Sequence, residues 1–181
     1  MNINSLFSLK GKCAVVIGGA GKIGFPMAES LAEAGAKVYI ASRNEKNYLP
    51  AVKKLQSEKL SVEGITLDQS NESCVLKVLN EISNNFKTPD ILINAGCYRP
   101  MKNYFDDTIE NWDKSMEVNA RGIFITCRVF GKAMAKEGKG SIINLSSIYG
   151  VVAPDMSIYE GSDFETEPDY PFLKGGIISF S

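Results

Sequence analysis

The sequence predicts an α/β fold built on a doubly wound parallel sheet, in a single domain that spans residues 1–181. Two observations lead to this prediction. Short apolar segments alternate with longer segments in which apolar residues recur at helical spacing, an order typical of parallel strands connected by helices. The short segments are also continuously apolar, as strands must be when helices cover both faces of a sheet. A chain of this length can bury one core of ordinary size.

The first half of the chain repeats one unit, in which a strand, a turn and a helix follow one another. Strands are expected at Lys12–Ile17, Lys37–Ala41 and Val62–Leu67. Helices are expected at Ile23–Ala34, Glu45–Glu58 and Glu72–Phe86. Gly35 ends the first of these helices, since glycine adopts the conformation that terminates a helix more readily than other residues.

The second half contains two more strands. The fourth is expected at Asp90–Asn94, and an irregular stretch follows it. A long helical region, Thr108–Lys136, leads to the fifth strand at Ser141–Leu145. A last helix is expected to start near Tyr170, because the next residue, Pro171, suits a first helical turn.

Composition excludes several classes of function. Twenty basic residues balance twenty-one acidic residues, for a formal net charge of −1, so no surface for nucleic acid or anionic membrane is predicted. The longest apolar runs are only as long as strands, and the N-terminus lacks a signal region. We therefore expect a soluble, cytoplasmic protein that acts on a small molecule, without a nucleic-acid or membrane partner.

The chain contains no histidine, which excludes Ser-His-Asp and Cys-His catalysis and histidine zinc sites. Acid–base chemistry therefore falls to other side chains, such as tyrosine and lysine. The cysteines lie in separate segments without the spacing of metal ligands, and no metal site is predicted. We expect Cys13, Cys74, Cys97 and Cys127 to be reduced and buried as small apolar residues.

The turn after the first strand reads GGAGKIG over residues 18–24. In dinucleotide-binding folds, a glycine-rich turn at this place lets a pyrophosphate approach backbone amides and the N-terminus of a helix. A tight turn without a ligand is the alternative. The residues expected to bind the cofactor here are Gly18, Gly21, Lys22, Ile23 and Gly24.

Residues after the second and third strands predict which cofactor is bound. Ser42 and Arg43 lie where dinucleotide folds contact the adenosine ribose, and an arginine can pair with a 2′-phosphate. This favours NADP over NAD. Asp68, after the third strand, could accept a hydrogen bond from the adenine amino group, and a role as a helix cap is equally compatible with the sequence.

Two tyrosines precede a lysine by one helical turn, a spacing at which the ammonium stabilises a phenolate. Tyr98 and Lys102 have Pro100 between them, so they are not expected to share a helical face. Tyr159 is a further rival, but its fourth neighbour is an aspartate. Tyr170 with Lys174 is therefore the preferred pair.

Five motifs in this order resemble the short-chain dehydrogenase/reductase family. They are the glycine turn, Asn94-Ala95-Gly96, Asn119 in the long helical region, Ser146-Ser147, and Tyr170 with Lys174. The resemblance runs from Leu9 to the last residue. It implies a Rossmann fold and NAD(P)-dependent transfer of a hydride between nicotinamide and a carbonyl or secondary alcohol.

The resemblance also implies a role for each matching residue. Tyr170 would exchange a proton with the substrate oxygen, and Lys174 would assist it and hold the nicotinamide ribose. Ser147 would hydrogen-bond the reacting oxygen. Asn119 would hold a water in a proton relay through Lys174. The cofactor side of the sheet would be supported by Asn94, Ala95 and Gly96.

The chain departs from the family pattern in three ways. Its glycine spacing is closer to that of the extended branch, which acts on nucleotide sugars. The segment between Ser147 and Tyr170 is longer than usual and acidic, and we expect it to be a solvated loop beside the substrate entrance. Family members also continue through further strands after this helix. We therefore expect missing C-terminal strands, weak cofactor binding and slow turnover.

The leading functional prediction is an NAD(P)-dependent oxidoreductase. The acidic segment and the Tyr170–Ile177 segment with Gly175-Gly176 resemble family members associated with the modification of bacterial surface sugars, and this resemblance implies a sugar-related substrate. One alternative is a non-catalytic remnant that only binds a dinucleotide. Another is a nucleotide-sugar epimerase or dehydratase. The resemblance further implies a homo-oligomer that pairs through the helices carrying Asn119 and Tyr170.

Overall fold

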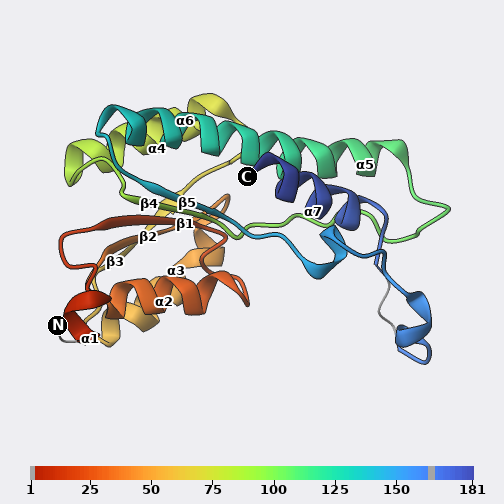
Figure 1. Ribbon diagram of the computed structural model, residues 1–181, viewed down its shortest axis with the longest axis horizontal. Coiled ribbons are helices and arrows are strands. Elements are labelled where there is room, and N and C mark those ends of the chain that lie inside the picture. The colour runs from red at the N-terminus through yellow and green to blue at the C-terminus, as the bar shows by residue number, and fades with distance from the viewer. Residues whose placement is uncertain (1–2, 163–165) are drawn as a thin grey trace.

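The computed structural model describes residues 3–162 and 166–181 (Figure 1). The described residues form a five-stranded parallel sheet in the order β3-β2-β1-β4-β5. The strands are β1 (Cys13–Ile17), β2 (Lys37–Ser42), β3 (Val62–Thr66), β4 (Ile91–Asn94) and β5 (Ser141–Asn144). The helices are α1 (Ile3–Leu6), α2 (Gly24–Glu33), α3 (Glu45–Ser57), α4 (Glu72–Asn85), α5 (Ile109–Ser115), α6 (Gly122–Lys136) and α7 (Asp169–Phe180). The predicted doubly wound parallel sheet is confirmed.

Helices cover both faces of the sheet, with α2 and α3 on one side and α4, α5 and α6 on the other (Figure 1). Successive residues of β1 point to opposite faces, so Val15 packs with Phe130 of α6, whereas Val16 packs with Leu55 of α3. All five residues of β1 are buried. This two-sided burial is the physical reason for the continuously apolar strands, since each fully buried large apolar side chain contributes about 1.5–3 kcal/mol.

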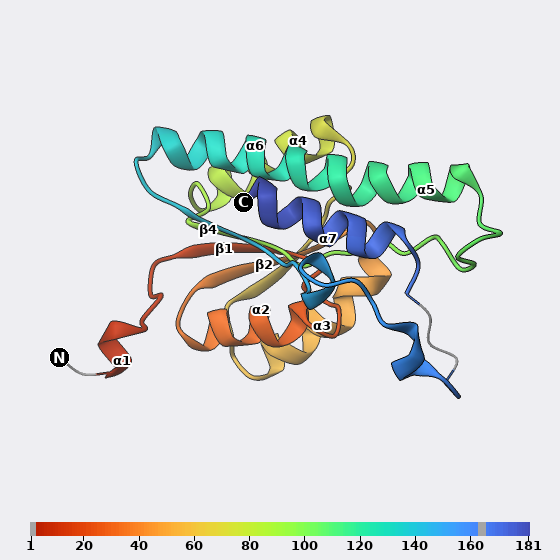
Figure 2. The same ribbon diagram turned by 45° about the vertical axis from the view of Figure 1, so that its right-hand side comes forward.

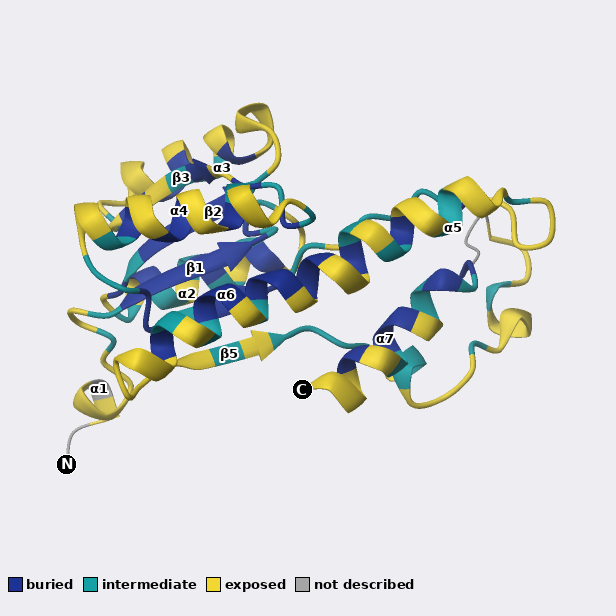
Figure 3. Ribbon diagram, turned by 90° about the horizontal axis from the view of Figure 1, so that it is seen from above, coloured by how far each residue is buried: buried dark blue, intermediate teal, exposed yellow. Residues whose placement is uncertain are grey.

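The burial pattern differs at one edge of the sheet. β5 pairs with β4 on one side only, and Ile143 in β5 is 45% exposed (Figure 3). The buried residues of α6, among them Val129 and Phe130, belong to the same core cluster as Val15 of β1. β5 is therefore one of the two edge strands of the described sheet, and β3 is the other.

The carboxyl ends of the central strands meet at one end of the sheet because all strands are parallel. Ile17 of β1 pairs with Ala41 of β2 and with Asn94 of β4. After β1 the chain adds β2 and β3 on one side of this strand, and it then adds β4 and β5 on the other side. A crevice at such a switch point is where α/β sheets bind their ligands.

The long helical region of the prediction is not one α-helix. It consists of α5, a π-helix at Met116–Arg121 and then α6. Apolar spacing predicts a helix, but it does not distinguish an α-helix from a π-helix, whose hydrogen bonds are shifted by one residue. Short π segments occur frequently at functional sites, and this one carries Asn119.

The last helix lies alongside α5 and α6, and the short helical turn Met156–Tyr159 lies away from the sheet (Figure 2). α7 begins at Asp169, one residue before the predicted start. Among the described residues, no helix is long and apolar enough to cross a membrane. The same part of the chain holds no cluster of cysteine or acidic side chains that is arranged to bind a metal.

Candidate functional site

A cleft of about 630 Å³ lies at the carboxyl ends of β1, β2 and β4. Nine of the residues predicted to bind a cofactor line it, and so do several that the sequence did not indicate, among them Asn47, Gln69 and Cys97. The nine predicted residues are Gly18, Gly21, Lys22, Ile23, Gly24, Ser42, Arg43, Ala95 and Gly96. The folded chain thus brings the glycine turn, the end of β2 and the end of β4 to one cleft.

The glycine turn is packed too closely for side chains, most of all at Gly18 and Gly24. Gly18 has a φ of +76°, and a Cβ there would lie 2.6 Å from the backbone of Gly96. A Cβ on Gly24 would lie 2.2 Å from the carbonyl oxygen of Gly18. Backbone packing therefore requires glycine at both positions.

The N-terminus of α2 opens on this cleft. Ile23 precedes the helix and forms no side-chain cap, so the first backbone N–H groups of α2 have no side-chain acceptor at that position. Such groups, together with the helix dipole, attract a phosphate. Lys22 lines the cleft beside them. The residues present therefore fit the pyrophosphate of a dinucleotide.

Arg43 lies beyond the end of β2 and lines the same cleft. Its guanidinium lies 4.8 Å from the centre of the Tyr98 ring, which belongs to the segment after β4. Ser42, the last residue of β2, also lines the cleft. Both residues have the location that the sequence predicted for contact with the adenosine ribose.

Four residues predicted to bind the cofactor do not line the cleft, namely Asp68, Asn94, Tyr170 and Lys174. The Oδ1 of Asp68 accepts hydrogen bonds from the backbone N–H and the hydroxyl of Ser70, at 3.0 and 2.7 Å, and so holds a turn. Asn71, not Asp68, caps α4. Asn94 donates to Asn144 of β5 at 2.8 Å and accepts from Thr126 of α6 at 3.1 Å, which ties β4 to both neighbours.

Tyr170 and Lys174 lie on α7, one helical turn apart. The Nζ of Lys174 lies 5.5 Å from the centre of the Tyr170 ring and donates to the carbonyl oxygen of Leu145 at 2.6 Å. Lys174 is only 8% exposed. Burial lowers the pKa of its ammonium group, and the Cys97 thiol acts in the opposite direction.

The two serines after β5 lie against α7. Ser146 donates its hydroxyl to the backbone carbonyl of Lys174 at 2.7 Å. Ser147 caps a 3₁₀ turn, Ile148–Gly150, by accepting from the N–H of Tyr149 at 3.2 Å. A Cβ on Gly150 would lie 2.6 Å from the backbone of Lys174. This close packing brings the Ser147 turn and the Tyr170 helix together.

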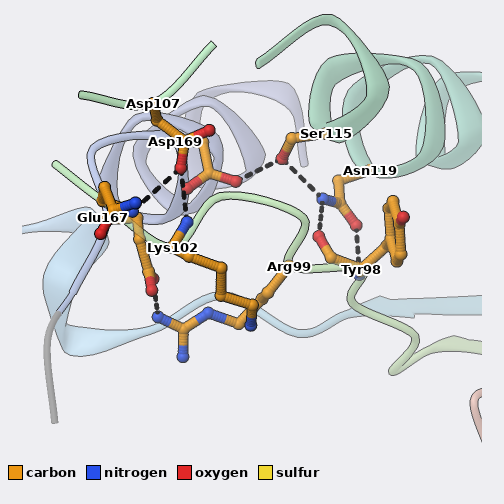
Figure 4. A network of polar contacts seen from close by, with 9 residues as sticks. Tyr98, Arg99, Lys102, Asp107, Ser115, Asn119, Glu167 and Asp169 are labelled. Carbon is orange, nitrogen blue, oxygen red and sulfur yellow. Dashed lines mark hydrogen bonds and ion pairs between the residues drawn. The ribbon is translucent and has the colours of Figure 1, made fainter. Parts of the chain in front are cut away.

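The side chain of Asn119 is buried and fully engaged. Its Oδ1 accepts from the backbone N–H of Tyr98 at 2.8 Å, and its Nδ2 donates to the Tyr98 carbonyl at 2.7 Å and to Ser115 at 3.1 Å (Figure 4). Asn119 therefore holds the segment after β4. Because its amide is occupied, a water relay would have to involve its backbone.

The rival tyrosines occupy other surroundings. The segment with Tyr98 and Lys102 is not helical, as expected. Tyr159 ends a 3₁₀ turn, Met156–Tyr159, and its hydroxyl contacts that of Tyr149. Neither tyrosine lies on the helix that carries Lys174.

The acidic segment corrects one expectation. Glu167 and Asp169 are buried rather than solvated. Glu167 pairs with Arg99, whose guanidinium lies 5.0 Å from the Tyr170 ring, and Asp169 accepts from the hydroxyl of Ser115. These pairs join residues far apart in the sequence, so no local pattern could indicate them. Asp163 and Glu165, also in this segment, lie outside the described residues.

The cysteines are free, as predicted, but their burial differs. Cys13 is buried, Cys74 and Cys127 are half-buried, and Cys97 is exposed, contrary to expectation. Cys97 follows Gly96 on the wall of the cleft, where the chain leaves the sheet.

Comparison with known proteins identifies the family and supports the fold. The sequence profile described as "short chain dehydrogenase" matches residues 12–164. The chain belongs to the short chain dehydrogenase family. An uncharacterized oxidoreductase of Thermotoga maritima is 30% identical over 176 residues, which are 96% of this chain and 64% of the relative. A cyclopentanol dehydrogenase of a Comamonas species is 34% identical over 83% of this chain and 61% of the relative.

Solved structures of short chain dehydrogenases share the fold. A gluconate 5-dehydrogenase from Burkholderia cenocepacia, in complex with NADP and tartrate, superposes with a TM-score of 0.84 at 25% identity. The superposition covers 99% of this chain and 66% of that structure. This short chain dehydrogenase thus spans about three fifths of the length of the curated relatives it matches.

Proposed function

We propose that the protein is an NAD(P)-dependent oxidoreductase that interconverts a carbonyl group and a secondary alcohol, with NADP as the preferred cofactor. The observation that carries the proposal is the placement of Tyr170 and buried Lys174 on one helix, beside the Ser147 turn. The glycine-lined cleft and the open N-terminus of α2 support a dinucleotide as the second reactant.

The bound cofactor would supply or accept the hydride at the substrate carbon. The hydroxyl of Tyr170 would give its proton to the substrate oxygen during reduction and take it back during oxidation. The ammonium of Lys174, held by the Leu145 carbonyl, would stabilise the phenolate that remains. The hydroxyl of Ser147 would donate to the same oxygen and stabilise its developing charge.

Arg43 supports the preference for NADP, because no acidic residue follows β2 at the place where a free 2′-hydroxyl is usually bound. Relatives use either nucleotide. The Burkholderia enzyme was crystallised with NADP, whereas a relative from Listeria innocua, 32% identical, is an NAD-dependent glycerol dehydrogenase. The positive charge of Arg43 therefore supports NADP as the cofactor more directly than the similarity to these relatives does.

A second pocket, of about 650 Å³, adjoins the N-terminus of α7 and is a proposed part of the substrate site. Tyr104 and Phe105 line it from one side, and Glu167 and Pro171 from the other. Aromatic faces beside a carboxylate suit a hydroxylated carbon chain or ring. Named relatives act on such compounds, for example the galactitol 2-dehydrogenase of Rhizobium johnstonii, which is 33% identical. We therefore propose a sugar-like or polyol substrate.

The loop that carries these aromatic residues is held by Asp107. Its Oδ2 accepts from the backbone N–H of Asn103 at 3.0 Å, and its Oδ1 accepts from the side chain of Asn111 at 2.7 Å. Assembly into a homo-oligomer stays a prediction, and size-exclusion chromatography with light scattering would test it.

The test begins with fluorescence titration of NADPH and NADH, followed by a screen of polyols and the corresponding ketones. We expect turnover by the wild type and a loss of at least about 100-fold in kcat for Tyr170→Phe, which cannot exchange the proton. Tyr170→Phe should still bind NADPH. Tyr159→Phe, the matched control, should keep its turnover.

Two outcomes would contradict the proposal. Undiminished turnover of Tyr170→Phe would show that another group exchanges the proton. Cofactor binding without turnover of any substrate, in the wild type as in the variant, would favour the non-catalytic alternative.

A further inference from the structure

Tyr98 makes a contact that the proposed chemistry does not require. The guanidinium of Arg43 lies over its ring at 4.8 Å from the centroid, within the range of a cation–π interaction. Both residues line the cofactor cleft. In the part of the chain that the structure describes, no carboxylate forms an ion pair with Arg43. The Tyr98 ring is thus the group against which this guanidinium rests.

Tyr98 is itself held in place. Its backbone N–H and carbonyl are both bonded to the side chain of Asn119, which is 3% exposed and belongs to the π-helix between α5 and α6. These two bonds fix the backbone of Tyr98, and so limit the places that its ring can reach. The ring is therefore more restricted than Arg43, which is an exposed side chain with several rotatable bonds.

The strand order explains why these two distant residues meet. β2 and β4 flank β1, so the segments after them reach across the carboxyl end of β1 from opposite sides. The glycine turn lies between them in the wall of the same cleft. A long cationic side chain loses conformational entropy when it binds a phosphate. A side chain that already packs on a ring has less entropy left to lose, so phosphate binding costs less free energy.

We propose that Tyr98 is a positioning residue that increases the preference for NADP over NAD by holding the Arg43 guanidinium at the cleft. This inference rests on the proposed function, because it assumes that Arg43 meets the 2′-phosphate. NADPH and NADH differ only in that phosphate. A general structural role of Tyr98 would change the affinity for both cofactors alike, whereas this role changes their ratio.

The experiment measures dissociation constants of NADPH and NADH by fluorescence titration, for the wild type and for Tyr98→Leu, Tyr98→Phe and Arg43→Gln. We expect Tyr98→Leu to reduce the NADPH-to-NADH preference by about 3–10-fold, in line with a partly exposed cation–π contact. Tyr98→Phe keeps the ring and should keep the preference. Tyr159→Leu serves as the matched control and should leave both dissociation constants unchanged.

Two further variants of Arg43 distinguish the loss of this contact from a general effect of Tyr98→Leu on folding. In an Arg43→Gln background, Tyr98→Leu should no longer change the ratio, because the guanidinium is gone. Arg43→Lys keeps the charge but not the planar group that stacks on a ring, and the effect of Tyr98→Leu should shrink there too. NADH binding by each variant reports directly that the cleft is folded.

The outcomes distinguish this inference from the function on which it rests. A wild type that prefers NADH would overturn both the NADP assignment and the role of Tyr98. A wild type that prefers NADPH, loses that preference in Arg43→Gln and keeps it in Tyr98→Leu would overturn the role of Tyr98 alone. Tighter NADPH binding by Tyr98→Leu would also overturn it, since the ring would then compete with the phosphate for Arg43.

Discussion

Single residues decide the shape of the cofactor cleft, and the glycines are the clearest case. Gly18 and Gly24 are the positions where the turn after β1, the start of α2 and the segment after β4 come within backbone contact. The sequence pattern indicates glycines that a phosphate could approach. The structure adds that the backbone itself excludes a side chain at both positions, whether or not a ligand is bound.

Gly24→Ala is therefore expected to destabilise the fold and to abolish cofactor binding. The new Cβ would lie 2.2 Å from the Gly18 carbonyl oxygen, and relieving such overpacking typically costs about 1–3 kcal/mol. Thermal unfolding and NADPH titration check this. Gly176→Ala in α7, where a Cβ meets no atom within 4 Å, is the control and should be neutral or stabilising by up to about 1 kcal/mol. Equal melting temperatures for wild type and Gly24→Ala would refute the argument.

At the scale of secondary-structure elements, α7 is attached to its neighbours at its first turn. Asp169 is 1% exposed and accepts from Ser115 at the end of α5, and Ser115 in turn accepts from Asn119 in the π-helix (Figure 4). The residue after Asp169 is Tyr170. This chain of hydrogen bonds therefore links the proposed catalytic tyrosine to the element that holds the cleft wall.

Loss of this link should impair catalysis more than cofactor binding. Ser115→Ala leaves the buried Asp169 carboxylate without its donor, so we expect α7 to shift and kcat to fall by about tenfold, which corresponds to about 1.4 kcal/mol. The dissociation constant of NADPH should change less than kcat. Steady-state kinetics with titration check this, and Ser157→Ala on the 3₁₀ turn Met156–Tyr159 is the control. Equal losses in kcat and in NADPH affinity would argue for a general structural role instead.

At the scale of the whole molecule, a buried carboxylate organises the end of the sheet away from the cleft. Asp90 accepts from the backbone N–H of Cys13 at 2.9 Å and pairs with Lys87 at 2.9 Å. Burial by itself raises the pKa of Asp90, but the hydrogen bonds from Cys13 and Lys87 outweigh it, and the pKa lies below its ordinary value.

This shift predicts how stability depends on pH. A carboxylate whose pKa is lower in the folded state contributes stability above its unfolded pKa of about 3.9, and the contribution is lost as pH falls through the folded value. Asp90→Asn should lower the free energy of unfolding by about 2 kcal/mol at pH 7 and flatten its fall below about pH 4. Urea unfolding from pH 2 to pH 7 checks this. An unchanged pH dependence in Asp90→Asn would contradict it.

Patterns within a few residues were sufficient to predict the strands, most helices, the glycine turn and the helix that carries Tyr170 and Lys174. Strand alternation, helical spacing and a turn of small residues depend on neighbours in the chain, so they can be read from it. The π-helix was missed because a shift of hydrogen bonds leaves apolar spacing nearly unchanged.

Contacts across long separations depended on the tertiary structure alone. Ser115 meets Asp169 across 54 positions, and Arg99 meets Glu167 across 68. Arg43 and Tyr98 come together only because β2 and β4 flank β1. The pairing of two side chains requires the backbone between them to be folded, and no spacing in the sequence specifies that path. The residue types in the sequence therefore limit the chemistry that this chain can perform. Which of these residues lie close together is decided by the fold.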